Sequence, residues 1–365
     1  MKHVSLITIH VGANFGSILQ AIATTKVLEK HNCTVEIVNY IPDRSTLNRL
    51  FSTSIKTLRL FIRMFITLPV FLFNRHIYSS FLAKYVRVSE PIYKKDDFVN
   101  CCPQANFYIT GSDQVWNSKH NEGLDKRYYF DSFPQGTTKI AYASSIGREA
   151  LEIDEYEEIK KMLATYKAIS VREASAKKII EKMGYEVTHL LDPTFMLDKE
   201  AWTHYMSERI INVAYLLVYL PYNIHDKRTI YQSVRKVAEK NKLKVVAFSW
   251  HIIPEKYADK TIYFANPGDF LSLVNYADYV VTNSFHGTAF SVNLNKQFIV
   301  YLPTGFGTRI KSILGLCHLE NRLLQSSEVI ADEMMNSWIN YAPINMILNK
   351  EREKAHAFLR KALGD

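Results

Sequence analysis

Cysteine is scarce in this sequence, with 4 in 365 residues, two of them adjacent as Cys101 and Cys102. Their spacing matches neither a zinc site nor a disulfide framework, which favours a reducing compartment and no structural metal. The opening stretch MKHVSLITIHVGANFG also lacks the cleavage site of a signal peptide and has the pattern of a strand followed by a glycine turn. These features predict a cytoplasmic protein without a metal site.

Signatures of nucleic-acid binding are missing, although the chain is basic. Lys and Arg total 45 against 36 Asp and Glu, a net charge of +9. Such an excess favours nucleic acid, an anionic membrane or an anionic substrate as partner. There is no zinc-finger spacing, no aromatic RNA-binding signature and no long basic tract. We therefore expect no nucleic-acid partner, and an anionic substrate or a membrane surface remains.

No apolar run is long enough to span a bilayer, which needs about 20 residues. The nearest candidate is SIKTLRLFIRMFITLPVFLFNRH, residues 54–76, which is basic, has no acidic residue, and is interrupted by Arg63 and Pro69. Two interpretations are open. The segment can lie on the inner face of the plasma membrane as a basic amphipathic element, or it can be a helix packed on its own domain or on a second subunit.

Internal repeats are also absent, and the chain instead alternates strands and helices. A buried-strand pattern, a glycine turn, a helix and the strand CTVEIVNYI form a βαβ opening, and the alternation restarts with VAYLLVYLP at 213–221. This predicts an α/β protein of two lobes that face a central cleft containing the strand-end loops. The predicted domains are 1–200 with a basic aromatic insertion at 54–90, 201–330, and a C-terminal helix at 331–365 that packs back on the first lobe.

The stretch TNSFHGTAFS, residues 282–291, follows a short strand and precedes a helical pattern. Thr282, Asn283 and Ser284 are typical N-cap residues, so the helix is expected to begin near His286 and Gly287. Unpaired N–H groups and the positive end of the helix dipole at that point suit an anion. The alternative is a hydrogen-bonded structural histidine.

Two loops in the first half carry groups suited to sugars or phosphates. In GANFGSILQ, Asn14 and Ser17 lie beside backbone N–H groups that can hold a phosphate or a hydroxyl, although a plain tight turn fits equally. In GSDQVWN, Asp113 supplies a carboxylate and Trp116 an aromatic surface. The amides of this second loop are Gln114 and Asn117. The alternative is a capping Asp113 and a Trp116 in the core.

A third loop, AISVREAS, places Arg172 directly after a short strand at a helix start. A guanidinium there can bind both oxygens of a carboxylate or phosphate. The alternative is a surface pair with Glu173, which contributes little energy.

Taken in order, these stretches resemble bacterial polysaccharide pyruvyl transferases. The similar segments are GANFGSILQA, GSDQVWN, ASSIG, SVREAS, LDPTFML, NPGDFLSLV, ADYVVTNSFHGTAFS and TRIKSILGL. The resemblance implies two Rossmann-like lobes similar to GT-B glycosyltransferases. It also implies transfer of pyruvate from phosphoenolpyruvate to two hydroxyls of a sugar, in a surface polysaccharide or its lipid-linked precursor. A cyclic ketal forms and phosphate is released, with no cofactor beyond the co-substrate.

The resemblance also implies roles for single residues. His286 would act as the acid or as a phosphate-binding cation, and Asp113 would orient or deprotonate the attacking hydroxyl. The expected donor-binding residues are Arg172, Ser284, Gly287 and Arg309. The expected acceptor-binding residues are Asn14, Ser17, Gln114, Trp116 and Asn117.

One position departs from the family pattern, because some members carry an arginine two residues before the histidine, where this chain has Ser284. Arg309, Lys311 or Lys296 can supply the missing charge. Two other functions stay open: a GT-B-type glycosyltransferase that uses a nucleotide sugar, and a glycan-binding relative without activity.

Overall fold

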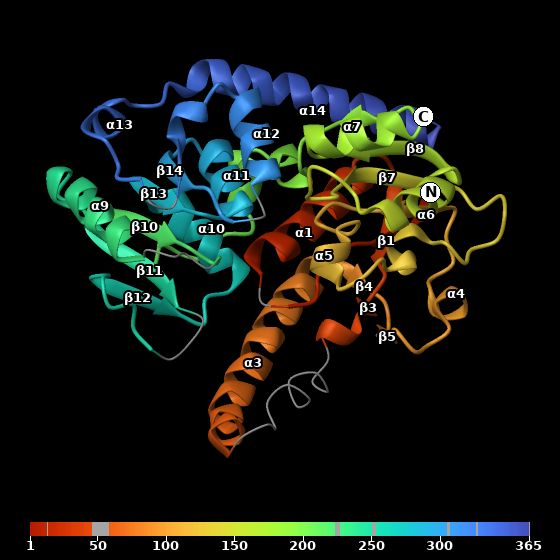
Figure 1. Cartoon of the computed structure of the whole chain (residues 1–365), viewed down its shortest axis with the longest axis horizontal. Helices are drawn as coiled ribbons and strands as arrows, with labels where there is room; N and C mark the ends of the chain where they lie inside the picture. Colours follow the sequence, from red (N-terminus) through yellow and green to blue (C-terminus); the bar gives the residue numbers. More distant parts are fainter. Residues whose placement is uncertain are drawn as a thin grey trace. The chain divides into compact units, whose positions relative to one another are not determined.

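A computed structural model describes residues 1–12, 14–45, 58–222, 227–249, 253–304, 307–325 and 328–364. The chain divides into two compact units (Figure 1). Unit 1 contains Met1–Met196 and Glu353–Asp365, and unit 2 contains Leu197–Arg352.

Unit 1 is built on a parallel sheet with the strand order β4-β2-β1-β6-β7-β8-β9. The first strand lies inside the sheet, where Val4 is in register with Val35 on one side and with Phe107 on the other. The strands are β1 (Lys2–Ile7), β2 (Cys33–Ile37), β4 (Arg87–Val88), β6 (Phe107–Thr110), β7 (Lys139–Ser144), β8 (Tyr166–Val171) and β9 (Thr188–His189).

Helices cover this sheet, and the longest buried one is α1 (Phe15–Glu29), in which most side chains are inaccessible. Asn14 starts it by accepting hydrogen bonds from the backbone N–H groups of Gly16 and Ser17. The other elements of unit 1 are short: β3 (Tyr40–Ile41), η1 (Asp43–Ser45), β5 (Ile92–Tyr93), α4 (Phe98–Cys101), α5 (Ser118–Asn121), η2 (Lys126–Tyr129), α6 (Ile153–Leu163), α7 (Ala174–Lys182) and η3 (Pro193–Met196).

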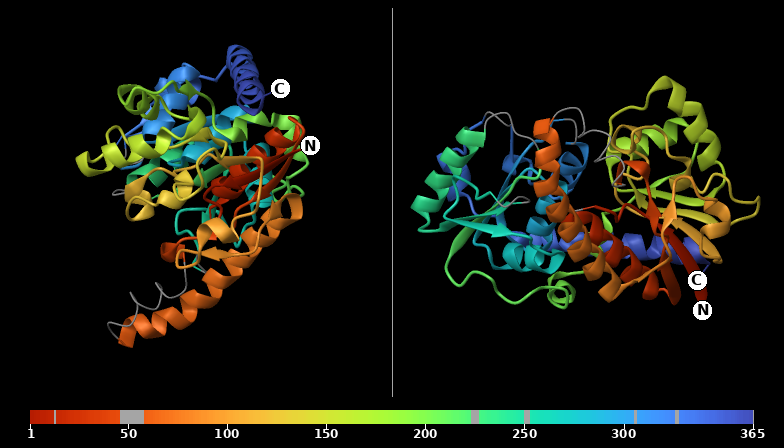
Figure 2. Two further views of the ribbon diagram at one scale, coloured as in Figure 1. Left: turned by 90° about the vertical axis from the view of Figure 1, so that its right-hand side faces the viewer. Right: turned by 90° about the horizontal axis from the view of Figure 1, so that it is seen from below.

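Most of the predicted basic aromatic segment is in α3 (Leu58–Tyr85), a long helix that contains Pro69. Asn74, Tyr78 and Leu82 are buried at a spacing of one helical turn, and Tyr78 stacks on Phe15 of α1 at 5.4 Å. The helix therefore packs on unit 1 through this stripe, and in Figures 1 and 2 its beginning extends away from the sheet. Residues 54–57, and the side chains up to residue 67, lie outside the described part. Within the described chain, no helix meets the length and apolarity that a bilayer crossing demands.

Unit 2 repeats the same plan with the strand order β12-β11-β10-β13-β14-β15, all parallel. Its strands are β10 (Tyr215–Tyr219), β11 (Lys244–Ser249), β12 (Lys260–Tyr263), β13 (Tyr279–Thr282), β14 (Gln297–Tyr301) and β15 (Leu323–Leu324). Its helices are α8 (Lys199–Thr203), α9 (Lys227–Lys240), α10 (Pro267–Tyr276), α11 (Phe285–Asn293), α12 (Thr308–Leu316), η4 (Glu320–Arg322) and α13 (Asp332–Asn336). The predicted α/β class is confirmed, with a Rossmann-like sheet in each unit.

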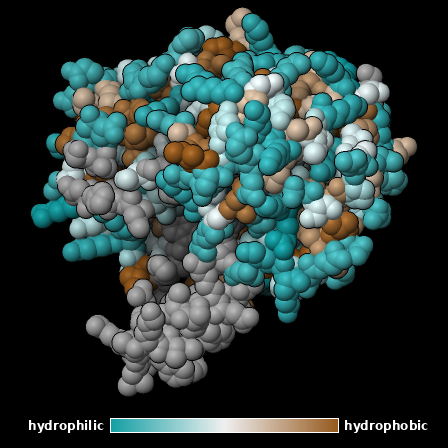
Figure 3. All heavy atoms as spheres, turned by 45° about the vertical axis from the view of Figure 1, so that its right-hand side comes forward, coloured by the Kyte–Doolittle hydropathy of each residue, from teal (hydrophilic) through white to brown (hydrophobic). Residues whose placement is uncertain are grey.

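The C-terminal segment differs from its predicted assignment, because residues 331–352 belong to unit 2 and only the end of α14 (Tyr341–Leu363) belongs to unit 1. Two contacts explain the assignment of its first half. The Tyr341 hydroxyl donates to the Ser291 carbonyl at 3.3 Å, and the Arg352 guanidinium donates to Asn293 Oδ1 at 2.8 Å. On the face drawn in Figure 3, hydrophilic side chains predominate and hydrophobic ones are scattered.

Candidate functional site

Each sheet has a topological switch point, where the chain leaves one side of the first strand and later returns on the other. In unit 1 this point lies between β1 and β6, and in unit 2 between β10 and β13. Ligands of open α/β sheets bind at the carboxyl ends of such strand pairs. The loops GANFGSILQ and GSDQVWN follow β1 and β6, and TNSFHG follows β13, so these three predicted loops lie at the switch points.

In unit 2, helix α11 begins at Phe285 and Ser284 is its N-cap, as the sequence predicts. The Ser284 hydroxyl accepts a hydrogen bond from the Gly287 N–H at 3.3 Å. Thr282 fixes the approach to the helix, because its Oγ1 donates to the Tyr219 carbonyl at 2.7 Å and accepts from the Ser284 N–H at 3.0 Å. The loop is thus held by its own side chains and directs the helix start toward the switch point.

Gly287 permits the close approach of this helix to the sheet. A Cβ atom at that position would lie 2.3 Å from Thr282 Oγ1 and 3.0 Å from Tyr219 Cδ1. The helix start can therefore occupy this position only without a side chain at residue 287.

Two basic side chains lie near the Phe285 ring at this helix start. His286 is in the first turn, 5% exposed, with its ring 5.0 Å from that of Phe285. Arg309, from the first turn of α12, places its guanidinium carbon 5.2 Å from the centroid of the same Phe285 ring, in cation–π contact. A histidine, an arginine and a helix N-terminus together can stabilise a small, highly charged anion.

The structure also distinguishes among the three residues suggested to replace the missing arginine. Lys296 lies beyond the end of α11, whose nine residues extend about 13 Å. Burial, together with the nearby Lys199, lowers the pKa of Lys296 to about 8. Lys311 is exposed. Arg309 is therefore the candidate in contact with the helix start.

In unit 1, Asp113 joins the loops after β1, β6 and β8. Its Oδ2 accepts from the Ser17 hydroxyl at 2.6 Å, and its Oδ1 accepts from the Gln114 N–H at 2.9 Å and from Arg172 at 3.1 Å. Arg172 also pairs with Asp192. Asp113 has a left-handed backbone with φ 74, a conformation that recurs at functional loops.

Arg172, predicted to bind the donor, lies in a buried ion-pair network of unit 1. Its side chain is 0% exposed, and its two terminal nitrogens are bonded to Asp113 and Asp192. Burial would lower the pKa of this guanidinium, but Asp192 and Asp113 raise it overall. The alternative of a surface pair with Glu173 does not apply, because both residues are buried, and Glu173 Oε1 accepts from the N–H groups of Ile146 and Gly147 at 2.8 Å each. Arg172 is a structural cation.

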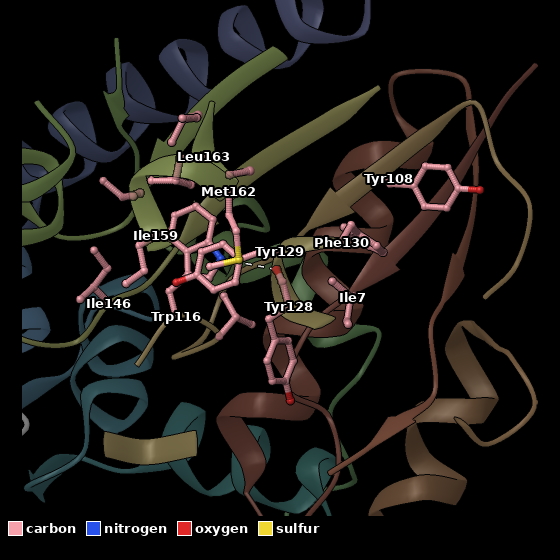
Figure 4. Packing of buried hydrophobic residues seen from close by; sticks show 14 of the residues in the cluster. Ile7, Tyr108, Trp116, Tyr128, Tyr129, Phe130, Ile146, Ile159, Met162 and Leu163 are labelled. Carbon is pink, nitrogen blue, oxygen red and sulfur yellow. Dashed lines mark hydrogen bonds between the residues drawn. The ribbon is translucent and has the colours of Figure 1, made fainter. Parts of the chain in front are cut away.

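Trp116 does not form an aromatic surface for a sugar, and the predicted role is corrected. It is 1% exposed and stacks on Tyr129 at 5.3 Å inside the hydrophobic core of unit 1 (Figure 4). Its indole N–H donates to the Tyr128 carbonyl at 3.4 Å. An apolar plate gains more free energy by burial in the core than at a wet loop.

Gln114 and Asn117, also predicted to bind the acceptor, are buried and bonded to the protein itself. Asn117 Nδ2 donates to Gln114 Oε1 at 2.7 Å, and Asn117 Oδ1 caps α5 by accepting from the His120 N–H. Both residues shape the loop. Asn14, in contrast, is exposed at the start of α1, and Ser17 is buried against Asp113.

The sequence reasoning missed His10 and Asn39, which follow β1 and β2 at the same edge of the sheet. His10 Nε2 lies 3.2 Å from Asn39 Oδ1. A polar residue directly after a buried parallel strand is the signal that would have identified them, since such residues meet at one edge of the sheet.

Solved structures with the same fold include UDP-GlcNAc 2-epimerases. The UDP-GlcNAc 2-epimerase of Methanocaldococcus jannaschii is 12% identical, with a TM-score of 0.52 and coverage of 100% of this chain and 99% of that one. The Neisseria meningitidis UDP-GlcNAc 2-epimerase bound to UDP-GlcNAc is 10% identical, with a TM-score of 0.51 and the same coverage. An S. aureus MnaA-UDP co-structure is 10% identical, with a TM-score of 0.52, and 99% and 91% are covered. The fold is thus that of the GT-B-like α/β enzymes.

Within this class, the chain belongs to the polysaccharide pyruvyl transferase family, whose model matches residues 14–303. The match supports a transferase of polysaccharide biosynthesis and agrees with the resemblance of the loop segments. No curated protein sequence matches the chain.

Proposed function

We propose that this protein transfers pyruvate from phosphoenolpyruvate to two hydroxyls of a sugar in a surface polysaccharide or its lipid-linked precursor, forming a cyclic ketal and releasing phosphate. The family match supports a pyruvyl transferase. The observation that carries the donor assignment is the position of His286 and Arg309 at the start of α11.

Phosphoenolpyruvate carries a phosphate and a carboxylate, so its site requires several positive groups in a small space. The α11 start supplies N–H groups and the positive end of a helix dipole. Arg309 supplies a planar fork that can bond two oxygens of one anionic group. Ser284 caps the helix and holds these N–H groups in place.

His286 is the proposed acid. An imidazole ordinarily titrates near pH 6.5, and a bound anion favours its protonated form. Transfer of that proton to the methylene carbon leaves a cation-like carbon, to which the first sugar hydroxyl adds with loss of its proton. Attack of the second hydroxyl on the same carbon then breaks the carbon–oxygen bond to phosphate. The products are the cyclic ketal and inorganic phosphate.

Unit 1 contributes the acceptor side in this proposal. Asn14 is exposed at the start of α1 and can bond sugar hydroxyls. Both oxygens of Asp113 already accept from protein donors, so Asp113 acts as a positioning residue that holds Ser17 at the start of α1 rather than as a base.

Calorimetric titration of phosphoenolpyruvate into wild type, Arg309→Gln and His286→Gln tests the donor site. Loss of one charge-assisted contact is expected to weaken binding about tenfold or more. Lys311→Gln is the matched control, because it removes an exposed charge from the same helix, and its affinity should equal that of wild type. Circular dichroism verifies that each variant is folded.

The opposite results are equally informative. Failure of folded wild type to bind phosphoenolpyruvate, with or without sugars present, would contradict the donor assignment. Binding of UDP in its place would indicate the nucleotide-sugar alternative.

A further inference from the structure

Unit 1 contains a cavity of about 420 Å³ that no step of the proposed reaction uses. It lies at the carboxyl ends of β1 and β2, with α3 as one wall. The residues that define its chemistry are His10, Gly12, Asn39, Arg75, Tyr78 and Ser79. It therefore occupies the strand edge at which open α/β sheets bind ligands.

The described side chains that can carry a positive charge in this cavity are not balanced by acidic ones. Its lining includes Arg75 from α3 and His10 from the end of β1, and the lining residues in the described chain include no carboxylate. Another surface hollow of unit 1 differs, since Asp96, Asp97 and Asp125 line it. The cavity beside α3 thus favours an anion.

His10 is held so that both ring nitrogens face oxygen acceptors. Nδ1 lies 3.0 Å from the Thr8 carbonyl and must donate to it. Nε2 lies 3.2 Å from Asn39 Oδ1, and the orientation of that amide is fixed because Asn39 Nδ2 donates to the Ser89 carbonyl at 3.2 Å. Only the imidazolium can donate to both oxygens.

Burial opposes this charge and lowers the pKa of His10, while the bonds to Thr8 and Asn39 act in the other direction. The other titratable groups of the cavity wall are Arg75 and Tyr78 of α3 and Tyr93 of β5. An anion in the cavity would favour the imidazolium. Binding is therefore expected to take up a proton.

Groups suited to a sugar also line this cavity, beside Arg75 and His10. Asn39, Ser79 and Ser89 present amide and hydroxyl groups. Tyr78 and Tyr93 contribute aromatic rings. On α3, within one turn of Arg75, Leu72 is 43% and Phe73 is 51% exposed, and these side chains can contact an aliphatic chain.

We infer that this cavity binds the phosphate-bearing end of the acceptor, a sugar phosphate or a sugar linked through a diphosphate, with Arg75 bonding the phosphate, the His10 imidazolium favouring it through its charge, and Asn39 and Ser79 near the sugar. Its assignment as the acceptor site rests on the proposed function, whereas anion binding by Arg75 and His10 does not. The phosphate chemistry is shared by soluble sugar phosphates and by lipid-linked sugars.

Calorimetry with the full chain tests this site, with glucose 1-phosphate and free glucose as probes. Glucose 1-phosphate should bind, and free glucose should bind at least about tenfold more weakly. Arg75→Gln should weaken the binding of glucose 1-phosphate about tenfold. Lys84→Gln, which removes an exposed charge from the same helix outside the cavity, should leave this binding unchanged. Equal affinity of Arg75→Gln and wild type would overturn the proposal.

Proton uptake on ligand binding distinguishes participation of His10 in binding from a purely structural role, because a structural role would leave the number of bound protons unchanged. Glucose 1-phosphate affinity should fall as the pH rises from 5.5 to 7.5, and titrations in buffers of different ionisation enthalpy should show uptake of a proton. Asn39→Asp keeps the acceptor for His10 and serves as the second variant: its added carboxylate should weaken phosphate binding. Absence of both the pH dependence and the Asn39→Asp effect would exclude His10 from the site.

Two further experiments distinguish soluble from lipid-linked sugar phosphates, and this acceptor-site proposal from the proposed function. Phosphatidylcholine vesicles containing a polyprenyl-diphosphate-linked hexose should bind more tightly than glucose 1-phosphate if Leu72 and Phe73 contact lipid, and Phe73→Ser should remove that difference. Phosphoenolpyruvate binding should be unchanged in Arg75→Gln. Loss of phosphoenolpyruvate binding in wild type, with Arg75-dependent sugar phosphate binding retained, would contradict the proposed function alone.

Discussion

At the residue scale, Gly287 determines how closely α11 approaches its sheet. Gly287→Ala puts a methyl group 2.3 Å from Thr282 Oγ1, so the helix start must shift. We expect a loss of about 1–3 kcal/mol in the free energy of unfolding, typical of overpacking, and weaker phosphoenolpyruvate binding. Urea denaturation and calorimetry measure the two effects.

Gly315→Ala in α12 is the matched control, since the nearest atom to its Cβ would be 3.7 Å away, an ordinary contact. Alanine is the better helix former, so this variant should be as stable as wild type or more so. Equal stability of the two variants would contradict the steric explanation.

Arg172 is a second residue whose role depends on burial. Arg172→Met leaves Asp113 and Asp192 as buried carboxylates without their cation, which should reduce the free energy of unfolding by about 3–5 kcal/mol. Lys177→Met removes an exposed partner of Glu181 and should change it by less than about 0.5 kcal/mol. Denaturant midpoints of the two variants provide the comparison, and a midpoint of Arg172→Met close to wild type would contradict a structural role.

These residues also mark the limit of what the sequence predicts about the site. Ser284 and His286 were correctly placed at a helix start because a short strand followed by N-cap residues has a local signature. The buried environments of Trp116 and Arg172 were not predicted because their partners, Tyr129 and Asp192, are distant in sequence. Aromatic and guanidinium groups suit both a core and a ligand site, and only the tertiary contacts distinguish the two.

At the element scale, the end of α14 is attached to unit 1 through a pair of histidines. His31 Nε2 and His356 Nδ1 are 3.0 Å apart, a hydrogen bond in which one ring donates and the other accepts. Burial lowers the pKa of His356, with Lys30 and Arg360 acting in the same direction and Glu353 opposing them. The docked helix end therefore prefers a neutral His356.

The pH dependence follows from this direction. In the detached helix end, His356 takes up a proton near the ordinary histidine pKa of about 6.5, whereas in the docked helix end it does so only at lower pH. Docking is therefore fully favoured above this pH and weakens as the pH falls through it. Amide hydrogen exchange of residues 356–363, corrected for intrinsic rates, should be faster at pH 5.5 than at pH 7.5. His356→Gln should abolish the difference, and His318→Asn, which changes an exposed histidine, should keep it. Persistence of the pH effect in His356→Gln would assign it to another group.

α14 also shows why element assignment from sequence was incomplete. A helix in the C-terminal segment was expected, and α14 begins at Tyr341. Its division between the two units depends on Tyr341 and Arg352, which bond to residues of unit 2. A helical pattern specifies which face is apolar, but not which of two cores that face contacts.

At the scale of the whole molecule, alternating strand and helix patterns were sufficient to predict the α/β class and two lobes, each of which contains a parallel sheet. Buried parallel strands such as VAYLLVYLP have continuous apolar runs, and their connections follow one hand, which restricts the possible topologies. The cavity beside α3 was not predicted, because it depends on how one long helix packs through Asn74, Tyr78 and Leu82.

The two proposed ligands belong to different units, which leads to a prediction for the whole chain. Phosphoenolpyruvate should slow hydrogen exchange at the starts of α11 and α12 in unit 2, and glucose 1-phosphate should slow it in the loop after β1 and in α3 near Tyr78 in unit 1. Each ligand at about 100 times its Kd should stabilise the native state by about 2.7 kcal/mol, because it binds the folded form alone.

Variants of each site test whether these two footprints are independent of each other. Arg309→Gln should remove the phosphoenolpyruvate footprint in unit 2 and keep the glucose 1-phosphate footprint in unit 1, and Arg75→Gln should do the reverse. A phosphoenolpyruvate footprint on the loop after β1 would instead place the donor in unit 1. The α11 start would then be a structural element, and the acid would have to be found among the residues of unit 1, where His10 is the buried imidazole at the switch point.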